Sequence, residues 1–191
     1  ALLISERVSA KLRHIADYKA ADLVDKFYYI MLADPHAEKF LCSEMVHTRL
    51  RHSMRKWIIH APTLKGEGLL EFAGQQYHIG NIHSRVGIPA SLLLKGMRII
   101  TQSMLNYIQS LALDSKLSIL MQQYVLVSIQ FASELMTYAY EKYQLNEAKN
   151  EESYRLQNLI EKLELEKGKQ QAALFNWENA LIYALVSRTA N

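Results

Sequence analysis

His83 is the side chain of this sequence best placed to do chemistry, because it stands near the end of a predicted helix among apolar residues. Those neighbours are Phe72, Ile79, Ile82 and Val86. In such surroundings an imidazole stays neutral, and a neutral imidazole is what a five-coordinate haem iron needs as its axial ligand. The segment Gly87-Ile88-Pro89 follows and ends the helix sharply, which would fix the position of the ring. His83 is therefore a candidate iron ligand.

A purely structural histidine is the alternative, and on this pattern alone it is the commoner case. Six other histidines compete for the same role: His14, His36, His47, His52, His60 and His78. His78 is the nearest in sequence, but five residues along a helix turn it about 140° from His83, so the two cannot bind one ion from one face. The spacings HExxH, CxxC and His-x-His are missing from the sequence, which argues against a zinc site.

Tyr28 is a second candidate, because it lies in an otherwise apolar helical segment where its hydroxyl needs a hydrogen-bond partner. In the commoner case the ring packs and the hydroxyl meets a backbone carbonyl or water. In the functional alternative the hydroxyl donates to bound oxygen, which carries partial negative charge. Such a bond would contribute about 1.5–3 kcal/mol, enough to change affinity roughly tenfold to a hundredfold.

Helices must position these side chains, since the sequence has few breakers and no alternating strand pattern. It contains three prolines and seven glycines in 191 residues, and half of its residues are hydrophobic. Asp34-Pro35 is typical of a helix start, with aspartate as N-cap and proline at the first helical position. The apolar spacing predicts helices from about Ser5, over 19–32, through Phe40 and Leu41, from Ser43 towards Pro62 and Gly66, and over 69–85, 89–113 and 115–144.

The two longest predicted helices, 89–113 and 115–144, carry apolar residues on more than one face. In the first, the residues expected to line the cofactor side are Leu93, Ile100, Met104 and Tyr107. In the second, the residues expected to form a further surface are Met121, Val125, Ser128, Ala132 and Leu135. The alternative is a single broad core face.

The polar segment 146–153 has no apolar face and is predicted to divide the chain into residues 1–147 and 148–191. A new helix is expected from about Tyr154. Its apolar residues alternate at spacings of four and three, as in a coiled-coil seam. They are Leu156, Ile160, Leu163, Leu174, Trp177, Leu181 and Ala184. Lys167 and Gln170 interrupt the seam, and residues 167–169 are expected to form a bend.

Charge and cysteine content argue against several classes of protein. The formal net charge is +3 and the basic residues are dispersed among acidic ones, unlike those of a nucleic-acid binder. There is no run of about 18 apolar residues for a membrane span, and the apolar start is too short for a signal peptide. The single cysteine, Cys42, fits a cytoplasmic protein. Ala1 in place of methionine, and the apolar pattern of the last residues, indicate a natural protein that is longer at both ends.

Three stretches carry a family resemblance. They are Phe27-Tyr28, Asp34-Pro-His-Ala-Glu-Lys-Phe40 and Ile82-His-Ser-Arg-Val-Gly-Ile-Pro89. In these stretches the sequence resembles the globin-coupled sensor family, and within it the haem-based oxygen-sensing diguanylate cyclases. Residues 54–59, 154–155 and 177–178 match as well, so the resemblance covers nearly the whole chain.

The resemblance implies an all-α chain, with a globin-like haem-binding helical domain followed by a helical linker that starts a middle signalling domain. It implies haem b as cofactor, His83 as the proximal iron ligand and Tyr28 as the distal tyrosine that hydrogen-bonds oxygen. Leu50 falls where the family has a distal leucine that limits the access of water. Residues expected as pocket walls or core are Phe27, Phe40, Met54 and Trp57. For Phe40 and Trp57, plain core packing is the favoured interpretation.

The resemblance also implies partners and an output. Oxygen or another diatomic gas would be the ligand, and helices 89–113 and 115–144 of two chains would form a four-helix homodimer. A C-terminal output domain would make cyclic di-GMP from two GTP molecules. Its GGDEF signature is absent from this sequence, so the chain is expected to be a sensor region and not itself an enzyme. The alternatives are a cofactor-free, globin-like dimeric interaction module, a gas sensor with a different output, and a haem enzyme such as a peroxidase or nitric-oxide dioxygenase.

Overall fold

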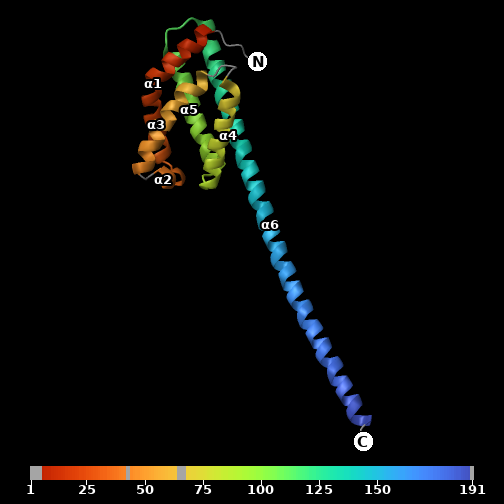
Figure 1. Ribbon diagram of the computed structural model, residues 1–191. Helices are drawn as coiled ribbons and strands as arrows, with labels where there is room; N and C mark the ends of the chain where they lie inside the picture. Colours follow the sequence, from red (N-terminus) through yellow and green to blue (C-terminus); the bar gives the residue numbers. More distant parts are fainter. Residues whose placement is uncertain (1–5, 42–43, 64–67, 190–191) are drawn as a thin grey trace. The chain divides into compact units, whose positions relative to one another are not determined.

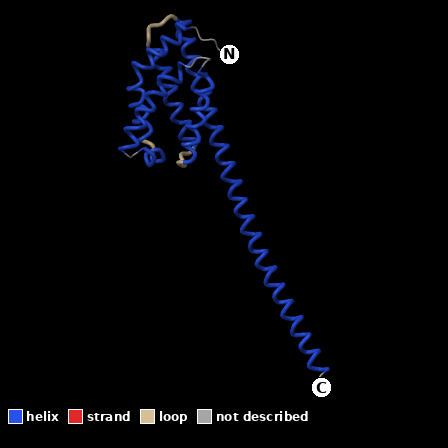
Figure 2. Tube along the Cα trace, in the orientation of Figure 1, coloured by secondary structure: helices blue, strands red, loops and turns tan. Residues whose placement is uncertain are grey.

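The computed structural model describes residues 6–41, 44–63 and 68–189, and helices joined by short turns account for these ranges (Figures 1 and 2). The helices are α1 (Glu6–Leu32), α2 (Pro35–Leu41), α3 (Glu44–His60), the short 3-10 helix η1 (Ala61–Thr63), α4 (Leu69–Arg85), α5 (Ala90–Ser110) and α6 (Ser115–Thr189). The expected all-α class is confirmed. Ser5, Ser43 and Gly66, where the sequence predicts helix boundaries, lie outside the described residues, as does Cys42.

Two helices are longer than the sequence predicts. Helix α1 is a single helix where two were expected, because residues 16–19 contain neither proline nor glycine. Helix α6 continues through 146–153 and 167–169, so the expected helix end at 144, the new start near Tyr154 and the bend at 167–169 are wrong. These residues lack an apolar face but are mostly good helix formers. Ion pairs about one turn apart, Arg155–Glu151 at 2.5 Å and Lys169–Glu166 at 2.8 Å, add local support.

Internal contacts divide the chain into two units, residues 1–144 and 145–191. The second unit consists of the later part of α6. Four residues of the expected seam, Leu156, Ile160, Leu163 and Trp177, are 53–63% exposed there. The side chains of Leu174, Leu181 and Ala184 lie outside the described set. Within the described residues, no helix has both the length and the apolar character that crossing a bilayer requires.

The core of the first unit is built on one face of α1. Helix α1 packs against α2, α3, η1 and α5, and its buried residues recur every four positions from Leu12 to Tyr28. They meet buried residues of α3, α5 and α6: Ile58, Leu93, Met97, Ile100, Met104, Ile108, Met121, Val125, Ile129, Ala132 and Met136. Helix α1 and the start of α6 thus both contribute to one core.

The same burial corrects an expectation about α6. Met121, Val125 and Ala132 are fully buried within the unit, and Ser128 is 5% exposed. These residues therefore do not form a further surface, because they already pack against the other helices of their own unit. The exposed apolar residues of this part of α6 are Ile119, Leu120, Leu126, Val127 and Tyr138.

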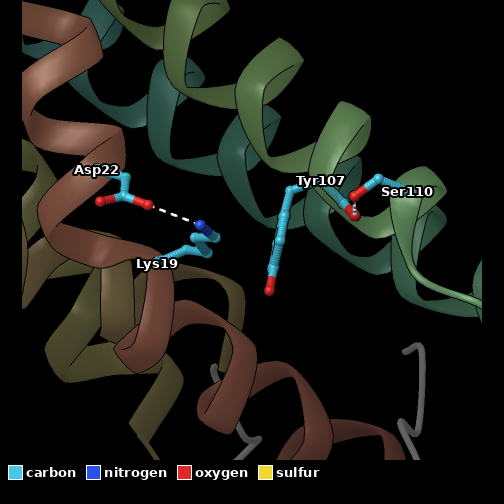
Figure 3. Close-up of polar contacts among 4 residues, drawn as sticks. All are labelled: Lys19, Asp22, Tyr107 and Ser110. Carbon is cyan, nitrogen blue, oxygen red and sulfur yellow. Dashed lines mark hydrogen bonds and ion pairs between the residues drawn. The ribbon is translucent and has the colours of Figure 1, made fainter.

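A polar contact joins α1 to α5 beside this core (Figure 3). Lys19 Nζ donates a hydrogen bond to Asp22 Oδ2 at 2.6 Å and lies 5.1 Å from the centre of the Tyr107 ring. Ser110 Oγ donates to the Tyr107 carbonyl at 2.8 Å, in the last turn of α5. Helix α5 ends here, three residues before the predicted end, and Asp114 caps the start of α6 by accepting from the backbone N–H of Lys116 and of Leu117.

Helices α4 and α6 approach each other closely at Gly80. A Cβ at this position would lie 2.4 Å from the carbonyl oxygen of Met136 and 2.8 Å from Cβ of Ala139. Both contacts are shorter than real Cβ atoms make, and one of them is to backbone. The absence of a side chain at Gly80 therefore sets the spacing of the helix that carries His83.

Gly80→Ala is expected to lower the free energy of unfolding by about 1–3 kcal/mol, because α4 and α6 must move apart to admit the methyl group. The matched control is Gly74→Ala on the same helix, where a Cβ meets nothing within 4 Å. That change is expected to stabilise by roughly 0.5–1 kcal/mol through helix propensity. Urea unfolding followed by circular dichroism measures both. Equal effects of the two substitutions would contradict the close approach at Gly80.

Candidate functional site

His83 lies in the last turn of α4, on the face that this helix buries. The buried residues Phe72, Gln76 and Gly80 are spaced by four, and His83 follows Gln76 by seven residues. Positions seven apart fall nearly on one line along a helix. The imidazole therefore continues the inward face of α4, and its side chain is partly buried.

The ring of His83 is held by its own helix. Nδ1 lies 2.8 Å from the carbonyl oxygen of Ile79, one turn earlier. Because a carbonyl can only accept, Nδ1 carries the proton, and Nε2 of the neutral ring keeps its lone pair. Burial lowers the pKa of His83, and the hydrogen bond to Ile79 opposes part of that fall. The ring is thus neutral, oriented and able to bind a metal through Nε2.

The turn after His83 closes the helix with backbone hydrogen bonds. Gly87 has φ of +78°, a left-handed conformation that favours glycine. The Ile88 N–H donates to the His83 carbonyl and the Gly87 N–H to the Ser84 carbonyl, both at 3.0 Å. This pair of bonds is the Schellman motif of helix ends. The sharp break predicted from Gly87-Ile88-Pro89 is confirmed, and it fixes the backbone of His83 itself.

The apolar neighbours expected around His83 differ in burial. Phe72 is 6% exposed and Ile79 is partly buried, so the side facing the core is apolar as expected. Ile82 and Val86 are 43% and 59% exposed. They flank the imidazole on the side of the helix that faces away from the core.

Tyr28 lies on α1 with 2% of its surface exposed. Burial raises the pKa of its phenol, and the charge of Arg51 opposes that rise, so the hydroxyl keeps its proton at neutral pH. The Phe27 ring meets Tyr28 edge to face, with centroids 5.4 Å apart and planes at 86°. Phe27 itself packs against Gly96 of α5, where a Cβ would lie 2.9 Å from the ring. The ring of Tyr28 is therefore fixed from within the core.

Of the remaining predicted residues, Leu50, Met54 and Trp57 lie on α3 and Phe40 lies on α2. Met54 and Trp57 pack against the core that contains Tyr28, whereas Leu50 is 39% exposed. A second buried cluster consists of Met31, Ala37 and Leu92, and the partly buried residues packed on it include Phe27, Phe40 and Ile88. Phe27 contacts both clusters. The structure thus joins Phe27, Tyr28 and Met54 in one core.

A hydrogen bond that the sequence does not predict links α3 to α4. Trp57 Nε1 donates to Gln76 Oε1 at 2.8 Å, and Gln76 is fully buried. Among the described residues, two buried side-chain atoms lack a hydrogen-bond partner, Gln76 Nε2 and the Tyr140 hydroxyl. Burial raises the pKa of Tyr140 to about 12. Spacing along α4 could have placed Gln76 on the same face as His83. No sequence pattern could have predicted its partner, because Trp57 lies on another helix.

The donor set of this site suits an axial haem ligand better than a multidentate metal site. In the described part of the chain, no group of three or more His, Cys, Asp or Glu residues is arranged to hold a metal ion. A haem group would require a single donor from the protein, such as a histidine nitrogen, because the porphyrin would supply the other donors to the iron. The neutral imidazole of His83, oriented by Ile79, fits that requirement.

Comparisons with known proteins agree on the region that contains this site. A family model described as Protoglobin matches residues 5–146. The diguanylate cyclase DosC of Escherichia coli strain K12 is 31% identical over 179 residues, which are 94% of this chain and 39% of that protein. DosC of Shigella flexneri matches equally, with 47% of its length covered. The chain therefore spans less than half the length of these curated relatives.

Solved structures show the same likeness. The ferrous and ferric crystal forms of the E. coli DosC globin domain each match with a TM-score of 0.68 and 29% identity, over 71% of this chain and 91% of theirs. The globin domain of the Geobacter sulfurreducens globin-coupled sensor matches with a TM-score of 0.61 and 21% identity, over 70% of this chain and 87% of its own. The fold of residues in the first unit is that of a globin domain.

Trp57→Phe is expected to lower the free energy of unfolding by about 1–3 kcal/mol, because it leaves both polar atoms of the buried Gln76 amide without partners. Adding Gln76→Met to that variant removes the orphaned amide and should restore most of the loss. Urea unfolding of the single and double variants measures this coupling. If the double variant is as unstable as Trp57→Phe, the hydrogen bond is not the cause of the loss.

Proposed function

Because the chain belongs to the protoglobin family, we propose that it is a haem-binding gas sensor in which His83 is the axial iron ligand. The observation that carries this proposal is the neutral His83 ring, held by the Ile79 carbonyl with Nε2 left free. Haem b, when bound, would supply the iron to which oxygen or another diatomic gas attaches. The likeness to a globin domain crystallised in ferrous and ferric forms supports iron at this site.

The residues on α1 and α3 would then select and retain the gas. The protonated, buried phenol of Tyr28 can donate a hydrogen bond to a ligand with partial negative charge. Leu50 would limit the access of water from the exposed edge of α3. Phe27 and Met54, which pack in the same core as Tyr28, would supply apolar walls.

We further propose that the output is cyclic di-GMP synthesis by a cyclase domain beyond this segment. The support is that the match to the diguanylate cyclase DosC covers 94% of the chain, well past residue 146, and so includes the linker. In that arrangement the continuous helix α6 would carry a change in the first unit towards the output domain. The single cysteine is compatible with function in the reducing cytoplasm.

A homodimer through α5 and α6 is the proposed assembly. The apolar side chains left exposed on α6 include two pairs seven residues apart, Ile119 with Leu120 and Leu126 with Val127, and they are 43–54% exposed. A spacing of seven puts both pairs on one face of the helix. Leu94 of α5 is 44% exposed as well. Burying such residues against a second copy would form the expected four-helix bundle.

The iron ligand is tested by reconstituting the protein with haem and recording its absorption spectrum. The wild type is expected to show a Soret band that shifts when oxygen is added to the reduced protein. His83→Ala should lose this spectrum, and added imidazole should restore it. His78→Ala, an exposed histidine of the same helix, is the control and should behave as the wild type. A colourless wild type would favour the cofactor-free module, and an unchanged spectrum in His83→Ala would assign the iron to another residue.

The dimer is tested by sedimentation of variants that place a charge on the exposed face of α6. Wild type is expected at twice the 22.0 kDa mass of one chain. The double variant Leu120→Glu/Val127→Glu should sediment as a monomer, because a buried carboxylate without a partner opposes association. The control is Leu70→Glu on α4, where the side chain is 86% exposed and outside the proposed interface. A dimer that survives the α6 substitutions would overturn this interface.

A further inference from the structure

Arg51 of α3 lies against the ring of Tyr28. The central carbon of its guanidinium group is 4.9 Å from the centre of the Tyr28 ring, within the range of a cation–π contact. Arg51 directly follows Leu50 in the chain, so it belongs to the same turn of α3. A permanent positive charge therefore lies over the ring of Tyr28, the residue whose hydroxyl is proposed to donate a hydrogen bond to the gas.

Asp25 holds the guanidinium in this position. Arg51 Nη1 donates a charge-assisted hydrogen bond to Asp25 Oδ1. Asp25 and Tyr28 are three residues apart on α1, so their side chains leave the helix on one side. Arg51 thus bridges two residues of α1, with an ion pair to Asp25 and a cation–π contact to the ring of Tyr28.

The bridge has an exposed end and a buried end. The side chain of Asp25 is 64% exposed and that of Arg51 36%, whereas Tyr28 is 2% exposed. Water screens the ion pair with Asp25 more than the contact with Tyr28. The interaction between Arg51 and the Tyr28 ring therefore takes place in a less polar medium than the interaction between Arg51 and Asp25. As a result, the Asp25 carboxylate only partly cancels the arginine charge at the ring.

We propose that Arg51 is a positioning residue for Tyr28. It fixes the orientation of the ring and polarises it, so that the phenol donates a stronger hydrogen bond to the gas ligand. A cation above an aromatic face draws electron density from the ring, which leaves the hydroxyl a better donor. Arginine does not lose its charge at any physiological pH, so the effect is constant. This proposal rests on the proposed function, in which Tyr28 donates to the gas.

The downward influence of Arg51 on the Tyr28 pKa is consistent with this polarisation, although burial acts more strongly in the opposite direction. Phe27 fixes the ring from another side, edge to face. The orientation of the phenol thus depends on a contact inside the core and on a contact to α3. Of the two, the contact to α3 carries charge.

The test is a double-substitution cycle on the rate of oxygen dissociation from the haem-loaded protein. Arg51→Gln is expected to accelerate dissociation about threefold to tenfold, in the range of one cation–π contact. In a Tyr28→Phe background the same substitution should have no effect, since the hydroxyl is gone. Arg51→Lys, which keeps a cation, should retain much of the wild-type rate. Asp25→Asn should accelerate dissociation less than Arg51→Gln.

A matched control comes from the next turn of α3. Arg55 pairs with Asp17 of α1 at 4.0 Å and is 55% exposed, so it also ties α3 to α1. Arg55→Gln should leave oxygen dissociation unchanged. The spectroscopic readout is the Cζ resonance of Tyr28 in protein labelled with ¹³C at that atom of tyrosine, recorded on the ferrous protein with carbon monoxide. Arg51→Gln should shift this resonance and Arg55→Gln should not.

Two results would separate the failures. If Tyr28→Phe leaves oxygen dissociation unchanged, the distal role of Tyr28 in the proposed function is wrong and the role of Arg51 falls with it. If Tyr28→Phe accelerates dissociation but Arg51→Gln does not, only the inference about Arg51 is wrong. Acceleration by Arg51→Gln that persists in the Tyr28→Phe background would also overturn it, because the arginine would then act by keeping α3 in place.

Discussion

The hydrogen bond between the His83 imidazole and the Ile79 carbonyl is the interaction on which the site depends. It sets the tautomer, and with it the nitrogen that is free to bind a metal. Two further features of the first unit fix the position of this pair. The Schellman motif fixes the backbone of His83 from the C-terminal side, and Gly80 lets α4 lie close against α6. A change in any of these would move the ring without touching it.

The helical class and most boundaries could be predicted from the sequence because they depend on local signals. The cap at Asp34 is confirmed, with Oδ1 accepting from the His36 N–H at 2.9 Å, and so is the break at Gly87. The segment 146–153 could not be placed from its pattern, because a missing apolar face shows only that a helix lacks a neighbour. It does not show that the helix ends, and residues with good propensity continue it when nothing interrupts the backbone hydrogen bonds.

The resemblance to globin-coupled sensors is confirmed. The proposal of His83 and Tyr28 as site residues rests on it, because composition and spacing left alternatives open. The resemblance could not predict the contacts that surround these two residues. Gln76 and Arg51 are ordinary polar residues in the sequence, and their partners Trp57 and Tyr28 lie on other helices. The apolar residues of α6 show the same limit from the opposite side. Their spacing shows that they share one face of the helix, but it does not show what that face packs against. In the structure, this face packs against the core of its own unit.

Phe27 lies at the junction of the two buried clusters of the first unit, and its ring occupies the space above Gly96. One cluster contains Tyr28, and the other is contacted by Ile88, from the turn that follows His83. A larger residue at position 96 would displace the ring, and a smaller one at position 27 would leave a void between both clusters. The side-chain volumes at positions 27 and 96 are therefore coupled. In related chains we expect a larger residue at position 96 to accompany a smaller one at position 27.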